Sequence, residues 1–294
     1  MGEIDMITVV CWKWQQSNYR SKFTAEHVNV LQQMVEKHLN LPHRFVCITD
    51  DPKGIDCETM PLWNEPQVNL PEGRPNCYRR LRAFAPDAAE WLGERILSID
   101  LDTVIVDDIT PLVDRDDDFV IWGDTARNTH YNGGFWLLRA GTRSRVWTEF
   151  TPDAPRLTRT MVGSDQAWIS HTLGPGESMW GEADGVYSYR NHLKEGALPL
   201  PPNARIVFMH GKFDPWDQLA QERSPWIKEH WTGEMIENKQ DKHARILKPQ
   251  VAKTSRQPRA TGVPGLSREE RLERRRRYIE QIRQRQRDRL NKRP

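Results

Sequence analysis

The chain has 294 residues, enough for one large domain or two modest ones with a buried core. Hydrophobic residues make up 37% of it and charged residues 29%, a composition typical of a soluble globular protein. No apolar run approaches the ~20 residues that span a bilayer, and Glu3 and Asp5 stand where a secretory signal would be positively charged. The four cysteines are Cys11, Cys47, Cys57 and Cys77. They form no C-x-x-C pair, so we expect reduced thiols in a cytoplasmic protein.

The net charge of +2 conceals two parts of opposite charge. Residues 242–294 contain 18 Lys and Arg against 5 Asp and Glu, whereas residues 1–241 contain 25 basic and 36 acidic residues. The sequence therefore predicts a folded body over residues 1–240, a polar, flexible linker over 241–266 and a basic tail over 267–294 that is helical or disordered.

The N-terminal part of the body predicts a βαβ unit. Ile7–Trp12 is an apolar, β-branched run typical of a buried strand, and Arg44–Thr49 is a second one. Between them, Thr24–Leu39 has apolar residues at helical spacing, with Thr24 as candidate N-cap. Strand, helix and strand within about fifty residues imply a parallel sheet with a right-handed crossover.

The rest of the body is predicted as alternating α/β up to about residue 125 and mixed after that, without internal repeats. Residues 53–76 and 175–203 are expected to be loops. The other predicted elements are a helix over Tyr78–Leu92, strands over Arg95–Ile99, Thr103–Val106, Asp118–Trp122 and Phe135–Leu138, a turn at Asn132-Gly133-Gly134, a helix over Ser164–Leu173 with Ser164 as N-cap, and a strand over Ile206–Met209.

The sequence Asp100-Leu101-Asp102 directly follows the predicted strand Arg95–Ile99. Residues two apart in an extended chain share a face and lie roughly 6.6 Å apart, so both carboxylates can converge on one hard cation such as Mg²⁺ or Mn²⁺. In open α/β sheets, ligands bind outside the carboxyl ends of the strands, where this pair falls. Because D-x-D alone is common, an acidic loop at the strand end is the alternative.

A cation at this place would suit the cleavage of a nucleotide-diphosphate sugar. The bond to the sugar breaks as negative charge builds on the β-phosphate. A metal ion that already holds both phosphates stabilises that charge without reorganisation.

Four segments carry a resemblance to a known family. They are ILSIDLDTVIVDDITPLVD (Ile96–Asp114), Tyr131-Asn132-Gly133-Gly134-Phe135, Gly163-Ser164-Asp165-Gln166 and Val207-Phe208-Met209-His210-Gly211-Lys212. In this order they resemble the core elements of GT-A glycosyltransferases, particularly the family 8 type and its bacterial and phage relatives, over roughly residues 5–220. The resemblance implies a nucleotide-sugar transferase with the GT-A fold, an α/β fold in which helices flank a mostly parallel, Rossmann-like sheet.

The resemblance also implies roles for single residues. Asp100, Asp102 and His210 would bind Mn²⁺ or Mg²⁺, and Asp100 would also face the donor. Asp165 would hydrogen-bond the hydroxyl groups of the donor sugar, and Gln166 would lie under its anomeric carbon. The remaining donor-binding residues would be Val10, Lys13 and Tyr19 around the base and ribose, Arg79 or Arg80 near the phosphate or sugar, Leu101 between the two aspartates, Asn132 and Gly133 at the sugar, and Lys212 at the diphosphate.

The C-terminal element departs from the family pattern. It usually reads His-x-x-Gly-x-x-Lys-Pro-Trp, whereas here Lys212 follows His210 by two residues and Phe213-Asp214-Pro215-Trp216 stands where Lys-Pro-Trp would. A UDP-sugar donor and retention at the anomeric carbon follow from the habit of the family alone. Since no carboxylate stands out as a nucleophile, the expected route is a front-face displacement in which the leaving phosphate helps to deprotonate the acceptor, a hydroxyl of a glycan, glycolipid or protein.

Other site chemistries fit less well. A haloacid-dehalogenase-type phosphatase also has D-x-D after a strand, but close to the N-terminus and followed by Gly and Thr. The acidic run Asp114–Asp118 lacks the Gly and the closing Glu of a calcium loop. No zinc-ligand spacing joins the candidate ligands Cys57, Cys77, His38, His43 and His130.

The alternatives of another class are a protein that binds a nucleotide-sugar without turnover, or a protein tethered to a membrane or a nucleic acid that acts through its basic tail. The tail could attract an anionic membrane face or a nucleic acid. Its one aromatic residue, Tyr278, offers no stacking platform for single strands, so we expect no sequence-specific nucleic-acid binding. A solvated extension, or peripheral contact with the inner membrane face, is the favoured interpretation of the tail.

Overall fold

The computed structural model describes residues 6–15, 22–63, 68, 70, 76–123, 129–158 and 162–232. These belong to the first of two units into which the chain divides, Met1–Lys239 and Gln240–Pro294. The predicted linker and tail, and the donor-binding candidate Tyr19, lie outside the described residues.

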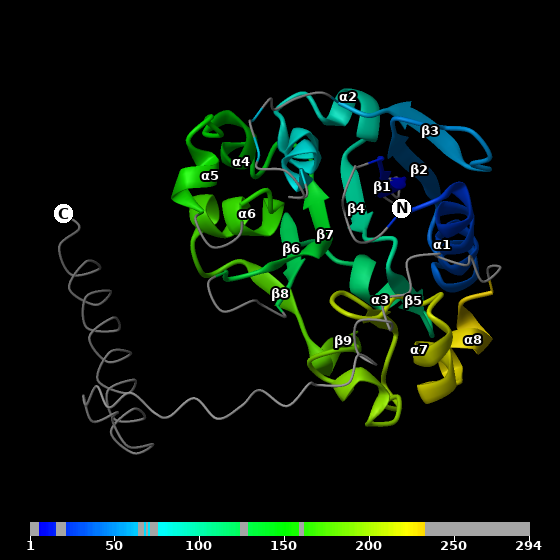
Figure 1. The fold of residues 1–294 in the computed structure, drawn as a ribbon. Coiled ribbons are helices and arrows are strands. Elements are labelled where there is room, and N and C mark those ends of the chain that lie inside the picture. The colour runs from blue at the N-terminus through cyan, green and yellow to red at the C-terminus, as the bar shows by residue number, and fades with distance from the viewer. Residues whose placement is uncertain are drawn as a thin grey trace, which may run out of the picture. The chain divides into compact units, whose positions relative to one another are not determined.

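A seven-stranded sheet forms the centre of the domain, in the order β3-β2-β1-β4-β7-β6-β8 (Figure 1). The strands are β1 (Ile7–Lys13), β2 (His43–Thr49), β3 (Glu58–Pro61), β4 (Arg95–Ile99), β6 (Phe119–Trp122), β7 (Asn132–Arg139) and β8 (Ser178–Trp180). β7 is antiparallel to both its neighbours, β4 and β6, and the other neighbouring pairs are parallel. The expectation of a mostly parallel sheet is confirmed.

A smaller sheet has the order β5-β10-β9. Its strands are β5 (Thr103–Ile105), β9 (Val186–Ser188) and β10 (Ile206–Phe208). β10 is parallel to β9 and antiparallel to β5. Since β5 follows β4 after three residues, the chain passes directly from the large sheet into the small one.

Helices pack against both faces of the large sheet and around the small sheet. They are α1 (Ala25–His38), η1 (Cys77–Phe84), α2 (Ala89–Leu92), α3 (Thr110–Val113), α4 (Arg145–Thr148), α5 (Ala154–Leu157), α6 (Asp165–Leu173), η2 (Glu182–Asp184), η3 (Lys194–Gly196), α7 (Gln218–Arg223) and α8 (Trp226–His230). In Figure 1, α1 lies beside β2 and β5, while α4, α5 and α6 lie together beyond β7 and β6.

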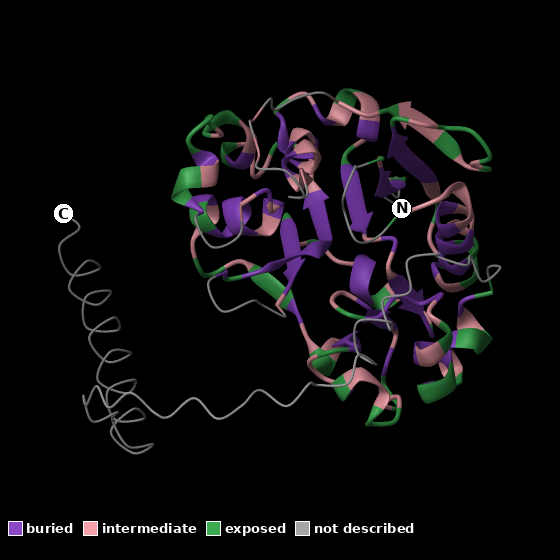
Figure 2. Ribbon diagram, viewed as in Figure 1, coloured by how far each residue is buried: buried purple, intermediate pink, exposed green. Residues whose placement is uncertain are grey.

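Two hydrophobic cores form on opposite faces of the large sheet, and its central strands are buried along nearly their whole length (Figure 2). Val9 and Cys11 of β1 belong to the core shared with α1 and the small sheet, and Val10 and Trp12 belong to the core shared with η1, α4 and α6. Successive side chains of a strand point to opposite faces, so the continuous apolar run of β1 fills both cores. The predicted strand–helix–strand unit is confirmed as β1, α1 and β2, and Thr24 is the N-cap of α1.

The prediction of one helix over Tyr78–Leu92 was wrong. η1 ends at Phe84, and α2 begins only at Ala89. Ala85 between them is extended, with φ −65° and ψ 151°, because the ring of Pro86 disfavours helical backbone at the preceding residue.

The prediction of loops over 53–76 and 175–203 was wrong in part. The first range contains β3, a short edge strand, and the second contains β8 and β9. These strands have three or four residues each, too few for periodicity to separate them from loops.

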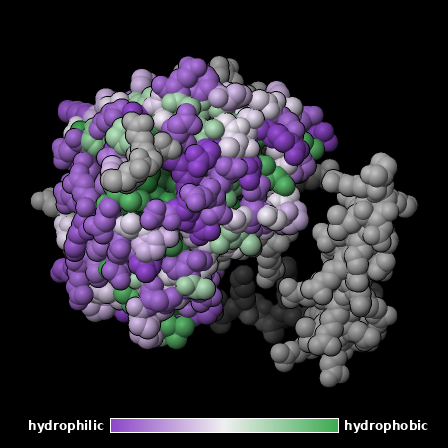
Figure 3. Space-filling model, turned by 180° about the vertical axis from the view of Figure 1, so that it is seen from behind, coloured by the Kyte–Doolittle hydropathy of each residue, from purple (hydrophilic) through white to green (hydrophobic). Residues whose placement is uncertain are grey.

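The surface is mostly hydrophilic on the face shown in Figure 3. The exposed large hydrophobic side chains come from four separate parts of the described chain: Met6, Leu157, Met179 and Leu198. Single exposed apolar residues of this kind are normal for a folded protein. No helix among the described residues has both the length and the apolar character to cross a bilayer.

Candidate active site

The D-x-D segment joins the two sheets. The backbone N–H of Asp100 donates to the carbonyl oxygen of Gly134 in β7 at 2.9 Å, and the N–H of Met209 donates to the carbonyl oxygen of Asp102 at 2.8 Å. Leu101 between them is 2% exposed and belongs to the hydrophobic core. Both ends of the segment are therefore fixed, and the two carboxylates lie at the carboxyl end of β4, where open sheets bind ligands.

Arg80 of η1 links two carboxylates from distant parts of the chain. Its Nη1 atom lies 2.6 Å from Oδ1 of Asp100 and 3.6 Å from Oδ2 of Asp165, and it donates to the carbonyl oxygen of Gly133 at 3.4 Å. Burial opposes the charge of the guanidinium, but the two aspartates raise its pKa above the ordinary value. The ring of Trp14, just after β1, lies 5.9 Å from Cζ of Arg80. One charged group thus fixes the end of β4 relative to the start of α6.

Asp165 is the first residue of α6 and is buried. Its Oδ1 accepts the backbone N–H of Gln166 at 2.9 Å, whereas its Oδ2 accepts no hydrogen bond. Burial raises the pKa of Asp165 to about 6, with Arg80 lowering it and Asp100 raising it. A buried acceptor without a donor is costly, and a hydroxyl group of a bound sugar would satisfy it, in keeping with the role that the resemblance implies.

Two glycines at the start of β7 leave space for these carboxylates. A Cβ at Gly133 would lie 3.0 Å from Oδ1 of Asp165, and a Cβ at Gly134 would lie 2.9 Å from Oδ2 of Asp100. Oδ1 of Asn132 accepts the N–H of Gly134 at 2.9 Å. The residues predicted as a turn are the first three of a strand, so their glycines provide close approach rather than a change of direction.

Asp102 lies in acidic surroundings. Burial and the neighbouring carboxylates of Asp100 and Asp214 together raise its pKa to about 7, although His210 opposes the shift. Asp214 is fully buried and was not among the predicted site residues. The sequence signal for it was its position, where the family has the lysine of Lys-Pro-Trp.

The side chains around Asp102 could hold a divalent cation by their chemistry. Within the described ranges, no group of three or more His, Cys, Asp or Glu side chains is already arranged to do so. The Asp100 carboxylate is paired with a guanidinium, and Nε2 of His210 lies 2.8 Å from Oγ of Ser188. Asp100, Asp102 and Asp214 would nevertheless supply hard oxygen ligands and His210 a nitrogen ligand, and a cation would relieve the repulsion among the carboxylates. The residues present therefore fit Mn²⁺ or Mg²⁺.

Two further predicted residues, Gln166 and Lys212, follow Asp165 and His210 closely in the chain. Nε2 of Gln166 donates to Oγ1 of Thr129 at 3.3 Å. Lys212 is exposed, and its ammonium group lies 4.7 Å from the centroid of the Phe213 ring.

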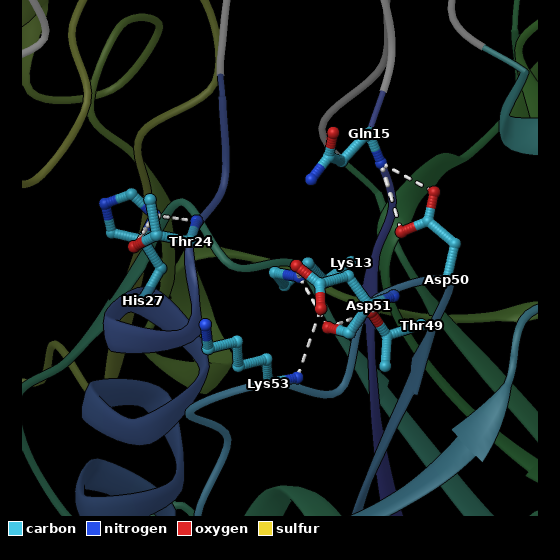
Figure 4. Close-up of polar contacts among 8 residues, drawn as sticks. All are labelled: Lys13, Gln15, Thr24, His27, Thr49, Asp50, Asp51 and Lys53. Carbon is cyan, nitrogen blue, oxygen red and sulfur yellow. Dashed lines mark hydrogen bonds and ion pairs between the residues drawn. The ribbon is translucent and has the colours of Figure 1, made fainter.

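The end of β1 forms its own polar network (Figure 4). Lys13 is 3% exposed, and its ammonium group donates to the carbonyl oxygen of Asp51 at 2.8 Å and lies 3.9 Å from Oδ2 of the same residue. The backbone N–H of Gln15 donates to the carboxylate of Asp50. These residues place a lysine and two aspartates at the carboxyl ends of β1 and β2.

Val10, Leu101 and Arg79 contribute no side chain to the contacts around the two aspartates, and Lys13 and Lys212 contact other residues. The side chains of Val10 and Leu101 pack in the two hydrophobic cores, so only their backbone atoms can face a ligand. Of the two candidate arginines, Arg80 contacts the aspartates, and Arg79 does not. Adjacent residues of a 3-10 helix point in different directions, so only one of the two arginines can face the aspartates, and the sequence alone left both open.

The fold is similar to that of solved glycosyltransferases. The glycosyltransferase GlyE of Streptococcus pneumoniae is 13% identical over 76% of this chain and 62% of its own, with a TM-score of 0.52. The galactosyltransferase LgtC, solved with donor and acceptor sugar analogues, is 14% identical over 76% of this chain and 96% of its own, with a TM-score of 0.48. The bifunctional WbbM is 11% identical over 80% of this chain and 53% of its own, with a TM-score of 0.49.

No protein-family model matches the chain, and no curated protein matches it in sequence. The likeness to GlyE, together with the sheet order, shows that the chain has the GT-A glycosyltransferase fold. This confirms the predicted fold class.

Proposed function

We propose that the protein is a metal-dependent glycosyltransferase, which moves a sugar from a nucleotide-diphosphate donor to a hydroxyl group. The observation that carries the proposal is the pair of carboxylates at the end of β4, one joined through Arg80 to Asp165 and the other beside His210. A GT-A fold with an intact polar site at this place favours turnover over mere binding.

Different residues of the chain would bind the metal ion and the donor sugar. Asp100, Asp102 and His210 would hold Mn²⁺ or Mg²⁺, which would stabilise the charge that develops on the leaving diphosphate. Asp165 would accept a hydrogen bond from the donor sugar through its unsatisfied Oδ2. Arg80 would hold the carboxylates of Asp100 and Asp165 at a fixed distance from each other, so that the metal and the sugar are positioned together.

We further propose a UDP-sugar as donor, retention at the anomeric carbon, and a glycan, glycolipid or protein as acceptor. The resemblance to family 8 supports the first two. For retention, Gln166 is an amide and Asp165 is engaged by Arg80, so neither is placed as a free nucleophile. The leaving phosphate would then take the proton of the acceptor hydroxyl. A cytoplasmic location, with membrane contact through the basic tail, also remains a proposal.

A thermal-shift screen of nucleotide-sugars tests the proposed function. A donor that binds the folded state stabilises it by RT ln(1 + [L]/Kd), about 2.7 kcal/mol at a hundredfold excess over Kd. We expect UDP-sugars to raise the melting temperature only when Mn²⁺ or Mg²⁺ is present, and metal-dependent hydrolysis of the same donor. If neither UDP- nor GDP-sugars shift the transition with either metal, the proposed function is wrong.

Gly134→Ala should impair the site more than the fold. The new Cβ would meet Oδ2 of Asp100 at 2.9 Å, and that carboxylate would have to turn away from its partner Arg80. We expect donor hydrolysis to fall about 10- to 100-fold, with a loss of only a few degrees in melting temperature. Gly181→Ala is the control, because a Cβ there has no heavy atom within 4 Å. Equal losses in the two variants would contradict the assignment.

A further inference from the structure

Arg190 occupies an unusual position beside the turn that follows β10. A Cβ built on Gly211 would lie 3.2 Å from Cδ and 3.3 Å from Nη1 of Arg190, so the guanidinium rests directly against the Gly211 backbone. Gly211 has φ +115°, a backbone conformation that residues other than glycine rarely adopt. The turn therefore requires glycine at this position for two reasons. Its backbone angle is unfavourable for other residues, and a Cβ would collide with the side chain of Arg190.

Hydrogen bonds that begin at Ser188 orient both Arg190 and His210. Nε of Arg190 donates to Oδ1 of Asn191 at 3.2 Å, and the backbone N–H of Asn191 donates to Oγ of Ser188 at 3.0 Å. The same Oγ lies 2.8 Å from Nε2 of His210. One serine thus connects the proposed metal ligand with the segment that carries the arginine.

Arg190 and Lys212 are two cations without an acidic partner among the described residues. In the described part of the chain Arg190 forms no ion pair, and neither does Lys212, the residue predicted to bind the diphosphate. The Lys212 ammonium instead lies over the ring of Phe213, at 4.7 Å from its centroid. Two cations that form no ion pair within the described ranges therefore lie on either side of the Gly211 backbone, next to the acidic surroundings of Asp102.

A metal-bound diphosphate would be complementary to this arrangement, with carboxylates on one side and cations on the other. Carboxylates on one side would hold the cation, and a guanidinium on the other would meet phosphate oxygens, which its fork of N–H groups can bind in pairs. The family lysine that would supply this charge is replaced by Asp214, which is buried and acidic. A positive group is then needed from another part of the chain, and Arg190 is the guanidinium that lies at the turn.

We propose that Arg190 is a diphosphate-binding residue of the donor site, acting across Gly211 in place of the missing lysine. The proposal rests on the proposed function, because it assumes a nucleotide-diphosphate donor. It shifts the main phosphate contact from Lys212, in the sequence element after β10, to the loop after β9.

The test compares the affinities of UDP and UMP, each with Mn²⁺, by titration calorimetry. In the wild-type protein the second phosphate should tighten binding. In Arg190→Gln the Kd for UDP should rise about 10- to 100-fold, and the Kd for UMP should change less, so that the advantage of the diphosphate shrinks. Arg190→Lys should recover part of the affinity for UDP, because it keeps the charge but not the fork.

Arg223→Gln is the matched control. Arg223 is an exposed arginine 5.1 Å from the Phe213 ring, so the variant removes the same charge from the same region without touching Gly211. Its Kd for UDP should stay within about threefold of wild type. Mn²⁺ binding without nucleotide should be retained in both variants, since neither residue is a proposed metal ligand.

The outcomes separate the two proposals. If wild-type protein binds UDP with Mn²⁺ but Arg190→Gln binds it equally well, or if Arg223→Gln weakens it as much, the assignment of Arg190 is wrong while the proposed function stands. If the wild-type protein binds neither UDP nor GDP with Mn²⁺, both are wrong.

Discussion

Asp102→Asn should abolish metal-dependent donor hydrolysis, with a fall of about 100-fold or more, and should also make the metal-free protein more stable at pH 8. The loss of activity is expected because an amide is a weak ligand for a hard cation. The gain in stability is expected because the carboxylate it replaces is partly buried and is repelled by Asp100 and Asp214. A variant that gains stability while losing function is typical of a site residue rather than a structural one.

The stability gain of the Asp102→Asn variant should depend on pH in a defined direction. The pKa of Asp102 is about 7 in the folded protein and near 3.8 in the unfolded chain. Between these values the folded state holds the proton that the unfolded state has lost, so this residue lowers stability progressively as pH rises from about 4 to about 7. The advantage of Asp102→Asn should therefore be absent below about pH 4, grow through that window and stay constant above it.

Thermal melts of metal-free wild type and variant across pH 4–8, with donor hydrolysis measured beside them, check both parts. Asp116→Asn makes the same change at an exposed aspartate away from the site, and it should alter neither property. Unchanged, metal-dependent hydrolysis in Asp102→Asn would remove the basis for the proposed metal site.

Those parts of the fold that depend on local pattern could be predicted from the sequence. β1 and α1 are long enough for periodicity to show, and Thr24 marks the start of the helix. β9 could not be found in this way, because its three residues form a strand only by pairing with β10, which comes later in the chain. Pro86 was a visible signal that should have divided the helix predicted over Tyr78–Leu92.

The candidate site was predictable where its residues stand in motifs. Asp100 and Asp165 lie in two of the four segments, and Arg80 was one of two arginines named for the phosphate or sugar. That Arg80 joins both aspartates depends on contacts between residues 20 and 85 positions apart, which no local pattern encodes. Arg190 likewise gains its proposed role only through its contact with Gly211.

Arg80→Met should have the second large effect, on stability as well as on turnover. The substitution keeps an apolar stem but removes the charge that lies 2.6 Å from Asp100 and 3.6 Å from Asp165. Removing one partner of a buried ion pair costs about 3–5 kcal/mol, because the other charges remain buried without compensation. Donor hydrolysis should be lost as well. The carboxylate proposed to bind the metal and the one proposed to bind the sugar would no longer be held in fixed positions relative to each other.

The loss of stability should itself depend on pH. Arg80 lowers the pKa of Asp165, which is about 6 in its presence, so that pKa should rise when the guanidinium is removed. Below the raised pKa the carboxyl group is neutral and needs no counterion, whereas above it the uncompensated charge weakens the folded state. We therefore expect the difference in melting temperature between wild type and Arg80→Met to be largest near pH 8 and to narrow toward pH 5.

Arg145→Met provides the comparison, because Arg145 is an exposed arginine that pairs with Glu149 on the surface of α4. Solvent and salt screen surface pairs of this kind, so the melting temperature of this variant should change little at any pH. A difference between Arg80→Met and wild type that stayed constant across pH would mean that the arginine stabilises the fold through packing alone. The carboxylates of Asp100 and Asp165 would then not depend on its charge, and the link between metal and sugar positions would have to come from another residue.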